Sequence, residues 1–597
     1  MTNDFIGYWG HATPELAQRL RQVASEVQKS GFLTNNPAVK EKSSSETEFL
    51  AGSWGDIQWG VARFNFHNQS DRALPTPGII AVLSASGLPD AKDAWVEVRE
   101  NQLILGREPF GRVPLYWTQA GNVIWFASRL QTLLALKSQR DISIPGFYGY
   151  TCFSYVPTPL TPVAEVYNVP AGTEIVWQFT DSGLTESRNQ YQWRSQPQQV
   201  RDETEAVTRL QGLLEEAISA QIAHLPSEPV GVFLSGGLDS SVVAALLVRM
   251  GVQVRGYTLD FGSDAAPEWP YAEQVANWLK IPLVKVPVTP KRVRKAMAAT
   301  ARALDMPFGD GVTVPLYLLS EAARQDTTVV FNGEGGDQLF AGWTNKPMIA
   351  AGIYRQEHPE DRAEDRGNFT EQYLRTFHRL AGYEAAVFPE PVQAVVADID
   401  PGDWLHEALE PSFSEGLLHR LRRATLMLKG AQNIHPRATA LGRWWGLDVR
   451  SPFCHLPLAE YQFQLTGDLF LRGSCEKYIL KCAAESWLPP EIIWRQKRGM
   501  GVPLTHWCLN KLWPEVYRWL NPQVLRSEGR LNPDLLIQTL GGKFGGNIYS
   551  RRIGEILWLL LMWQLWRTQV FGEPAALPSP LSLVIGHLSL VIRKRVS

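Results

Sequence analysis

The 597-residue chain is poor in cysteine, in charge of one sign and in long apolar runs, and each shortage excludes a class of protein. Its five cysteines form no C-x-x-C pair; they are Cys152, Cys454, Cys475, Cys482 and Cys508. Such an odd, scattered set argues against a disulfide framework or a zinc cage and predicts a reducing, cytoplasmic setting. A formal net charge of −2 gives no bulk attraction to nucleic acid or to an anionic membrane surface.

No apolar stretch is long enough to cross a bilayer, for which about 20 residues are needed. The most apolar run, residues 556–563, is bounded by Glu555 and Gln564 and predicts a buried core helix. The residues around Asp4 are polar where a secretory signal would need a basic and then an apolar stretch. We therefore expect a soluble chain, and its length predicts more than one domain.

The pattern of apolar residues divides the chain into two α/β parts. In the first part, short β-branched runs separated by turn residues predict an antiparallel sheet; they cover residues 78–83, 95–98, 102–105 and 123–127, with a helix over 14–29. A polar stretch at 195–199 predicts a linker. Strands then alternate with helical patterns, which is typical of a doubly wound parallel sheet; the segments are 204–223, 230–247, 256–261, 268–279 and 281–286.

Residues 230–247 contain an apolar strand, a turn with Gly236 and Gly237, and a helical pattern that resumes at Ser241. Backbone N–H groups at such a helix N-terminus hold anions. Three hydroxyls can donate to the same phosphate: Ser235, Ser240 and Ser241. Asp239 would repel a phosphate unless a divalent cation lay between them, so it is a candidate Mg²⁺ ligand. The stretch is not a Walker loop, because the lysine of that motif is missing.

A second apolar strand runs into a glycine-rich turn at residues 328–342, which carries Glu334 and Asp337 three positions apart. The flanking glycines allow both carboxylates to reach one site, although an acidic surface turn would look similar. Ligands of parallel sheets bind beyond the carboxyl ends of the strands. The strand ends at Leu234 and Leu259 are therefore expected to face a nucleotide.

Several of these segments resemble known motifs. The string S-G-G-L-D-S-S at 235–241 resembles the pyrophosphate-binding loop of the N-type ATP pyrophosphatases, which cleave ATP to AMP and pyrophosphate. N-G-E-G-G-D-Q-L-F-A-G at 332–342 resembles the S-G-E-G-x-D-E-x-F-x-G motif of asparagine synthetases. L-D-V-R-S-P-F at 447–453 and W-R-Q-K-R-G-M-G-V-P-L at 494–504 are similar to two further motifs of that family.

The first part of the chain has a resemblance of its own. R-E-P-F-G-R-V-P-L-Y-W at 107–117 resembles a segment of the class II glutamine amidotransferase domains of asparagine synthetases, and 127–129 and 169–173 fit further pieces. The resemblance implies an Ntn-hydrolase-like sandwich of sheets and helices over residues 1–195. It implies an ATP pyrophosphatase domain over 204–570, and the tail at 571–597 has no counterpart and no assigned role.

The chain departs from this family at two places. Such glutaminases use the thiol of a cysteine after the initiator Met as nucleophile, and here Asn3 stands in its place. No N-G-E-I-Y-N-like strand, which grips glutamine in the family, is present either, so we expect an inactive glutaminase domain. Residues 439–445 replace the D-R-x-S-M-A-H run beside the expected acceptor pocket, which leaves the identity of the carboxylate substrate open.

The resemblance implies an ATP- and Mg²⁺-dependent ligase that activates a carboxylate, aspartate first of all, as an acyl-adenylate for amidation by ammonia. Asp239 and Asp337 would hold Mg²⁺, Lys497 would neutralise phosphate charge, and Glu334 would act as base. The implied ATP contacts are Leu234, Ser235, Gly236, Gly237, Asp239, Ser240, Ser241, Leu259, Asn332 and Gly333.

Two other functions stay open. The chain could join a different carboxylate and amine, as the related β-lactam synthetases and lasso-peptide cyclases do, since those relatives also lack the N-terminal cysteine. The β-lactam synthetases carry tyrosine at the position of Glu334, so this glutamate favours the asparagine type. Alternatively, the chain could be an inactive ATP-binding homologue. A homodimer or a separate protein that donates ammonia would be compatible with either active form.

Overall fold

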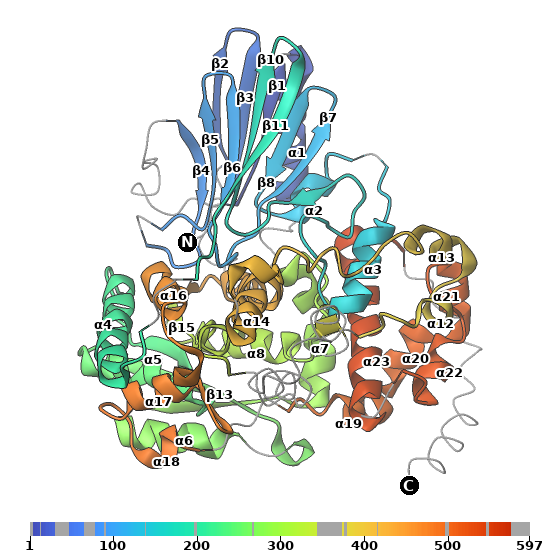
Figure 1. Ribbon diagram of the computed structural model, residues 1–597. Helices are drawn as coiled ribbons and strands as arrows, with labels where there is room; N and C mark the ends of the chain where they lie inside the picture. The colour runs from blue at the N-terminus through green and yellow to red at the C-terminus, as the bar shows by residue number, and fades with distance from the viewer. Residues whose placement is uncertain are drawn as a thin grey trace.

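The computed structural model describes residues 4–11, 13–29, 47–64, 78–88, 91–137, 139–195, 200–265, 268–342, 370, 373–374, 379–414, 416–495, 501–544 and 549–574. A β-rich body formed by the first part of the chain stands on a larger, mostly helical body (Figure 1). The two α/β parts expected from the sequence are therefore present, while Asn3 and Lys497 lie outside the described residues.

Two antiparallel sheets form the β-rich body. The first has the order β2-β3-β1-β8-β7-β9; its strands are β1 (Asp4–His11), β2 (Glu48–Trp54), β3 (Ile57–Phe64), β7 (Tyr116–Ala120), β8 (Val123–Ala127) and β9 (Tyr167–Asn168). The second has the order β11-β10-β6-β5-β4; its strands are β4 (Ile79–Leu83), β5 (Ala94–Arg99), β6 (Gln102–Arg107), β10 (Thr173–Thr180) and β11 (Gly183–Gln190).

Alternation along β1 shows how the sandwich is built. Phe5 and Trp9 belong to an apolar core that they share with strands of the second sheet, such as Trp177 on β10. Ile6 and Tyr8 belong to the other core, on the face covered by helix α1 (Pro14–Lys29). Successive side chains of a strand point to opposite faces, so one strand serves both cores. The predicted antiparallel sandwich is confirmed, as is the helix over residues 14–29.

The larger body is organised around a parallel sheet with the order β14-β13-β12-β15-β16. Its strands are β12 (Val230–Phe233), β13 (Val254–Asp260), β14 (Leu283–Pro287), β15 (Val329–Phe331) and β16 (Asp448–Arg450). The connecting helices are α5 (Leu238–Arg249), α6 (Trp269–Leu279), α7 (Pro290–Leu304) and α8 (Thr313–Ala323). In Figure 1, α6 lies below the sheet and α8 above it, which confirms the doubly wound arrangement. The edge strand β16 was not predicted.

Further helices surround this sheet. Those before residue 340 are α2 (Leu130–Leu134), α3 (Ile144–Phe153), α4 (Glu203–Gln221) and α9 (Gly336–Leu339). Between residues 384 and 462, on either side of β16, the helices are α12 (Glu384–Val387), α13 (Glu390–Val396), α14 (Leu417–Thr425), the π-helical η6 (Leu426–Ile434), α15 (His435–Trp444) and α16 (Leu456–Gln462).

Among the described residues, the stretch 471–566 adds a small hairpin and seven α-helices. The hairpin strands are β17 (Leu471–Arg472) and β18 (Cys475–Glu476), and the helices are α17 (Tyr478–Ala484), α18 (Pro490–Ile493), α19 (Leu504–Leu509), α20 (Trp513–Leu520), α21 (Pro522–Glu528), α22 (Leu535–Leu540) and α23 (Tyr549–Trp566). Residues 556–563 of α23 are buried, as predicted for a core helix. Within the described part of the chain, no helix has both the length and the apolar character needed to cross a membrane.

The two bodies are joined by side chains that pass from one to the other. Tyr150 of α3 donates a hydrogen bond of 2.7 Å to the Leu559 carbonyl of α23, and Phe147 stacks on Trp563 at 4.2 Å. Figure 1 shows α3 beside α23, inside the helical body. The first part of the chain therefore contributes one helix to the core of the second.

Asp305, at the end of α7, forms another joint. Its carboxylate accepts hydrogen bonds from the backbone N–H of Leu130 and of Gln131, the latter at 3.1 Å. The Gln131 side chain adds a bond of 2.8 Å, and Arg129 forms an ion pair at 3.5 Å. Asp305 thus accepts hydrogen bonds from the first N–H groups of α2. The N-cap residue of that helix, Arg129, makes no capping hydrogen bond with its own side chain.

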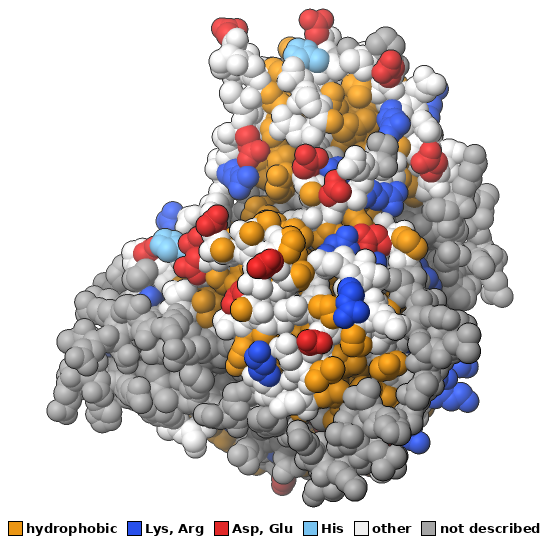
Figure 2. Space-filling view, turned by 90° about the vertical axis from the view of Figure 1, so that its right-hand side faces the viewer, with side chains coloured by type: hydrophobic (Ala, Val, Ile, Leu, Met, Phe, Trp, Pro, Cys, Tyr) orange, Lys and Arg blue, Asp and Glu red, His pale blue; other side chains and the backbone are white. Residues whose placement is uncertain are grey.

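Charged side chains are mixed on the face seen in Figure 2. On the part of that face that the structure describes, acidic and basic side chains are interspersed with apolar ones, and neither sign gathers into an extended patch. This distribution agrees with the nearly balanced composition of the chain, which has 58 Lys and Arg residues against 60 Asp and Glu residues.

We expect Asp305→Ala to lower the free energy of unfolding by about 3 kcal/mol, because it removes the acceptor of two N–H groups at the start of α2 and the counter-charge of Arg129. Urea unfolding followed by tryptophan fluorescence measures the loss. The control is Glu273→Ala, which breaks the exposed pair with Lys285 and should cost less than about 1 kcal/mol. Equal effects of the two substitutions would contradict the assigned role of Asp305.

Candidate active site

The first glycine loop, residues 235–241, connects β12 to α5. Gly236 has φ +72°, and a Cβ there would collide with the backbone of Tyr271, so only glycine fits. The Ser235 hydroxyl accepts from the Gly237 N–H at 3.2 Å and lies 3.2 Å from the Ser240 hydroxyl. No side chain caps the start of α5 in the described structure. Its first N–H groups can therefore receive an anion.

Two predicted residues of this loop, Gly236 and Ser241, make contacts within the protein and do not line the cavity. Ser241 is fully buried and donates its hydroxyl hydrogen to the Gly237 carbonyl at 2.8 Å, which ties the first turn of α5 together. The Gly236 carbonyl accepts a hydrogen bond of 2.9 Å from Arg495. Both residues shape the loop, and neither lines the cavity described below. The helix also starts at Leu238, three residues earlier than predicted.

The second glycine loop, residues 332–337, follows β15 and lies against the first. A Cβ on Gly333 would come within 2.8 Å of the Ser240 nitrogen, and one on Gly336 within 2.5 Å of the Asp239 carboxyl carbon. The glycines are therefore required by the close approach of the two loops. Asn332 is buried, and its side-chain oxygen accepts from the Glu334 N–H at 3.1 Å, which holds the start of the loop.

A lysine that the sequence analysis missed joins the two loops. Lys477 pairs with Asp239, and its ammonium lies 2.5 Å from Asp337 Oδ1. Burial alone would lower the pKa of this lysine, but attraction and hydrogen bonding by both carboxylates outweigh burial and raise it. Gly342 leaves room for the lysine stem, since a Cβ there would collide with the Lys477 Cε.

The position of Lys477 in the sequence gave little warning of this role. It has φ +56° and immediately precedes α17, so it resembles any lysine at the start of an amphipathic helix. Its partner Asp239 is 238 residues away. The left-handed conformation is unusual for a residue with a side chain, but it is seen in the structure and not in the sequence.

The carboxylate pair fits the predicted magnesium. Since one ammonium contacts both Asp239 and Asp337, the two carboxylates lie within reach of a single cation. Mg²⁺ at nucleotide sites is bound through one or two carboxylates plus phosphate oxygens, which is the donor set available here. Among the described residues, no group of three or more His, Cys, Asp or Glu side chains could hold a metal by itself.

A cavity of about 370 Å³ opens where the loops meet. Of the predicted residues it is lined by Leu234, Ser235, Gly237, Asp239, Ser240, Leu259, Asn332, Gly333, Glu334 and Asp337. The structure thus brings ten sequence-predicted residues to one site. Asn3 and Lys497 are not among the described residues, so their positions stay untested.

Two further walls of the cavity were not predicted. On one side, Arg495 lies 3.8 Å from the centre of the Tyr271 ring, next to Glu268, whose pKa is raised by burial and only partly lowered again by Arg495. On the other side, α8 and α15 pack together and present an apolar surface; it consists of Leu316, Leu319, Ala438 and Leu441. The cavity is therefore polar at the loops and apolar beneath the two helices.

Comparisons with known proteins identify the family of the chain. The family model "Asparagine synthase" matches residues 209–568, and the model "Glutamine amidotransferase domain" matches residues 94–192. The chain is 24% identical over 509 residues to asparagine synthetase [glutamine-hydrolyzing] 1 of Bacillus subtilis, with 80% of this chain and 76% of that protein covered.

Two further relatives have similar identities to this chain. A putative asparagine synthetase [glutamine-hydrolyzing] of Mycobacterium bovis is 25% identical over 536 residues, with 80% and 76% coverage. Asparagine synthetase [glutamine-hydrolyzing] of Mus musculus is 25% identical over 368 residues, with 59% of this chain and 54% of that protein covered. With a family match over more than half of its length and two glycine loops converging on one cavity, the chain belongs to the asparagine synthase family.

Proposed function

We propose that this protein is an ATP-dependent ligase that activates a carboxylate as an acyl-adenylate and converts it to an amide. The observation that carries the proposal is the convergence of the two glycine loops on a cavity in which Asp239 and Asp337 share one cation. A phosphate loop alone would fit many nucleotide-binding proteins. The paired carboxylates opposite it fit a reaction in which pyrophosphate leaves with a bound metal.

In the first step, an oxygen of the substrate carboxylate attacks the α-phosphorus of ATP, and the bond from that phosphorus to the pyrophosphate oxygen breaks. Ser235, Ser240 and the N-terminus of α5 hold the departing pyrophosphate. When bound by Asp239 and Asp337, Mg²⁺ supplies positive charge to its oxygens. Lys477, and Lys497 by its motif, add fixed positive charge at the same place.

In the second step, the amine nitrogen attacks the acyl carbon, gives up a proton and displaces AMP. Glu334 is the proposed acceptor of that proton, because its carboxylate lines the cavity and its backbone is fixed by Asn332. Leu234, Leu259 and Gly333 are the proposed contacts of the adenosine, by their place at the strand ends.

Aspartate with ammonia is the first substrate pair that we propose. The apolar surface formed by α8 and α15 favours a second candidate, a carboxylate with an apolar body that is joined to another amine. Residues 439–445, which replace the family motif, lie on α15 and just beyond it. With Asn3 in place of the thiol, ammonia would come from solution or from a separate donor protein.

A pyrophosphate-release assay with ATP, Mg²⁺ and a panel of acids and amines tests the proposal. Aspartate-dependent formation of AMP and asparagine with ammonia supports the first pair. Turnover with a different acid and amine, and none with aspartate, supports the second. Nucleotide binding without pyrophosphate release under every condition would show an inactive homologue and would contradict the proposal. Glutamine hydrolysis by the purified protein would contradict the assigned loss of the glutaminase.

Lys497→Ala is expected to reduce pyrophosphate release at least about 100-fold, because a preorganised cation that meets developing phosphate charge contributes several kcal/mol to the transition state. Circular dichroism and the thermal midpoint should stay unchanged, since the lysine has no predicted structural role. Activity close to that of the unmodified protein would refute the role of Lys497.

Lys477→Met should lower the free energy of unfolding by about 3 kcal/mol, since Asp239 and Asp337 lose the cation between them. Mg²⁺ without nucleotide should then raise the thermal midpoint of the variant more than that of the unmodified protein, because the metal replaces the missing charge. Differential scanning fluorimetry with increasing Mg²⁺ measures this.

The matched control is Lys481→Met. Lys481 lines the same cavity but donates to the Cys475 sulfur at 3.4 Å. Its removal should leave the response to Mg²⁺ as it is in the unmodified protein. A response that is equal in all three proteins would show that the two carboxylates do not share a metal.

A further inference from the structure

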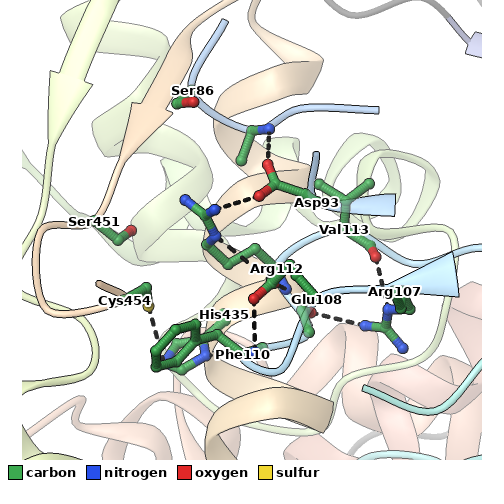
Figure 3. A network of polar contacts seen from close by, with 12 residues as sticks. Ser86, Asp93, Arg107, Glu108, Phe110, Arg112, Val113, His435, Ser451 and Cys454 are labelled. Atoms are coloured by element: carbon green, nitrogen blue, oxygen red, sulfur yellow. Dashed lines mark hydrogen bonds and ion pairs between the residues drawn. The ribbon is translucent and has the colours of Figure 1, made fainter. Parts of the chain in front are cut away.

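A buried polar network lies between the β-rich body and the second glycine loop (Figure 3). Arg112 pairs with Asp93 and lies beside Glu108, at 3.7 Å. The Glu108 carboxylate accepts two backbone hydrogen bonds of 2.7 Å each, from Phe110 and from Arg112 itself. These bonds fix the tight turn at residues 108–112, which is part of the segment that resembles a glutamine amidotransferase.

This turn contacts the helical body at two places: Gly111 packs closely against Ala431 of η6, and Phe110 bonds to a histidine. The Phe110 carbonyl accepts a hydrogen bond of 2.7 Å from His435 Nδ1. Burial lowers the pKa of His435 to about 4, so the ring is neutral at pH 7 and carries its single proton on Nδ1. Its Nε2 faces the Cys454 sulfur at 3.8 Å, as an acceptor for the thiol hydrogen. Figure 3 shows His435 between Phe110 and Cys454.

Cys454 ends a loop that supports the second glycine loop. Its N–H donates to the Ser451 carbonyl at 2.9 Å, and the Ser451 hydroxyl donates to Asn332 Oδ1 at 2.9 Å. The neighbouring Phe453 fills the space beside Gly335, where a Cβ would come within 2.9 Å of it. Burial raises the pKa of the Cys454 thiol, and the Glu334 carboxylate lies near enough to raise it further.

A backbone hydrogen bond forms a second contact between the same two bodies, besides His435. Val449 of β16 donates its N–H to the Ala85 carbonyl of the β-rich body at 2.7 Å, and β16 pairs with β15 on its other side. The Arg450 carbonyl accepts from the Asn332 N–H at 3.0 Å. Residues 448–454 therefore touch the β-rich body on one side and the second glycine loop on the other.

We propose that His435 is a positioning residue, which transmits the placement of the 108–112 turn through Cys454 to Asn332 and Glu334. The β-rich body, which has Asn3 at the place of a nucleophile, would thereby act as a fixed support of the ligase site. The inference rests on the proposed function for its catalytic consequence. Its structural part, the coupling of the turn to the second glycine loop, does not depend on any substrate.

Two substitutions separate the two contacts of the ring. In His435→Asn, the amide nitrogen can take the place of Nδ1 and keep the bond to Phe110, while nothing reaches Cys454. In His435→Gln, the amide can take the place of Nε2 and keep the contact with Cys454, while the bond to Phe110 is lost. If the ring couples the 108–112 turn to the second glycine loop, both substitutions interrupt the series of contacts, although each retains one contact of the ring.

We expect each variant to lower kcat for amide formation about tenfold, since small displacements of reacting groups cost that much or more. The KM for ATP should stay within about twofold, because the first glycine loop is not touched. Hydrogen exchange should become faster at residues 332–337 and stay unchanged at 235–241. Wild-type kcat together with wild-type exchange in both variants would overturn the proposal.

The matched control is a pair of cysteine substitutions. Cys454→Ala should reproduce the faster exchange at 332–337, whereas Cys508→Ala, which removes a thiol in α19 that is at least as deeply buried, should not. Equal effects of the two would show a general loss of stability and would also overturn the proposal. If the unmodified protein turns over no substrate pair, the proposed function fails, while the exchange results still decide whether His435 couples the turn to the loop.

Discussion

The site depends on one buried ammonium, that of Lys477, between two carboxylates. Asp239 and Asp337 come from different glycine loops, and without a cation their mutual repulsion would push the loops apart. A lysine from a third segment satisfies both and leaves them at a spacing that a divalent ion can use. The same charge arrangement thus stabilises the fold of the loops and prepares the site for a nucleotide with its metal.

The loops can meet only because side chains are absent where they touch. Gly333 and Gly336 face Ser240 and Asp239 so closely that a methyl group would not fit. Close approach of this kind is intolerant of small shifts, so the segments behind the loops matter as well. The contacts of residues 448–454 with the β-rich body, through His435 and through Ala85, provide such a support.

Much of the architecture was predictable, because local patterns report local structure. Short β-branched runs separated by turn signals predicted the antiparallel sheet, the family resemblance implied the sandwich, and strand–helix alternation predicted the parallel sheet. The misses are of a different kind. The edge strand β16 has three residues, too few for a recognisable pattern, and it pairs with β15 more than a hundred positions earlier in the chain. The start of α5 at Leu238 was missed because glycine and aspartate obscure a helical pattern.

The sequence by itself determined which residues could form the two glycine loops. In both loops the strand, the glycine turn and the polar residues follow one another directly along the chain, so the pattern can be recognised locally. Only the tertiary structure decided that Lys477 would lie between the carboxylates and that His435 would join the two bodies. Lys477 immediately precedes α17, and His435 begins α15 directly after the π-helical η6. The contacts of Lys477 with the two carboxylates and that of His435 with Phe110 are made across 140 or more positions. Long-range packing, rather than any local pattern, determines such partners.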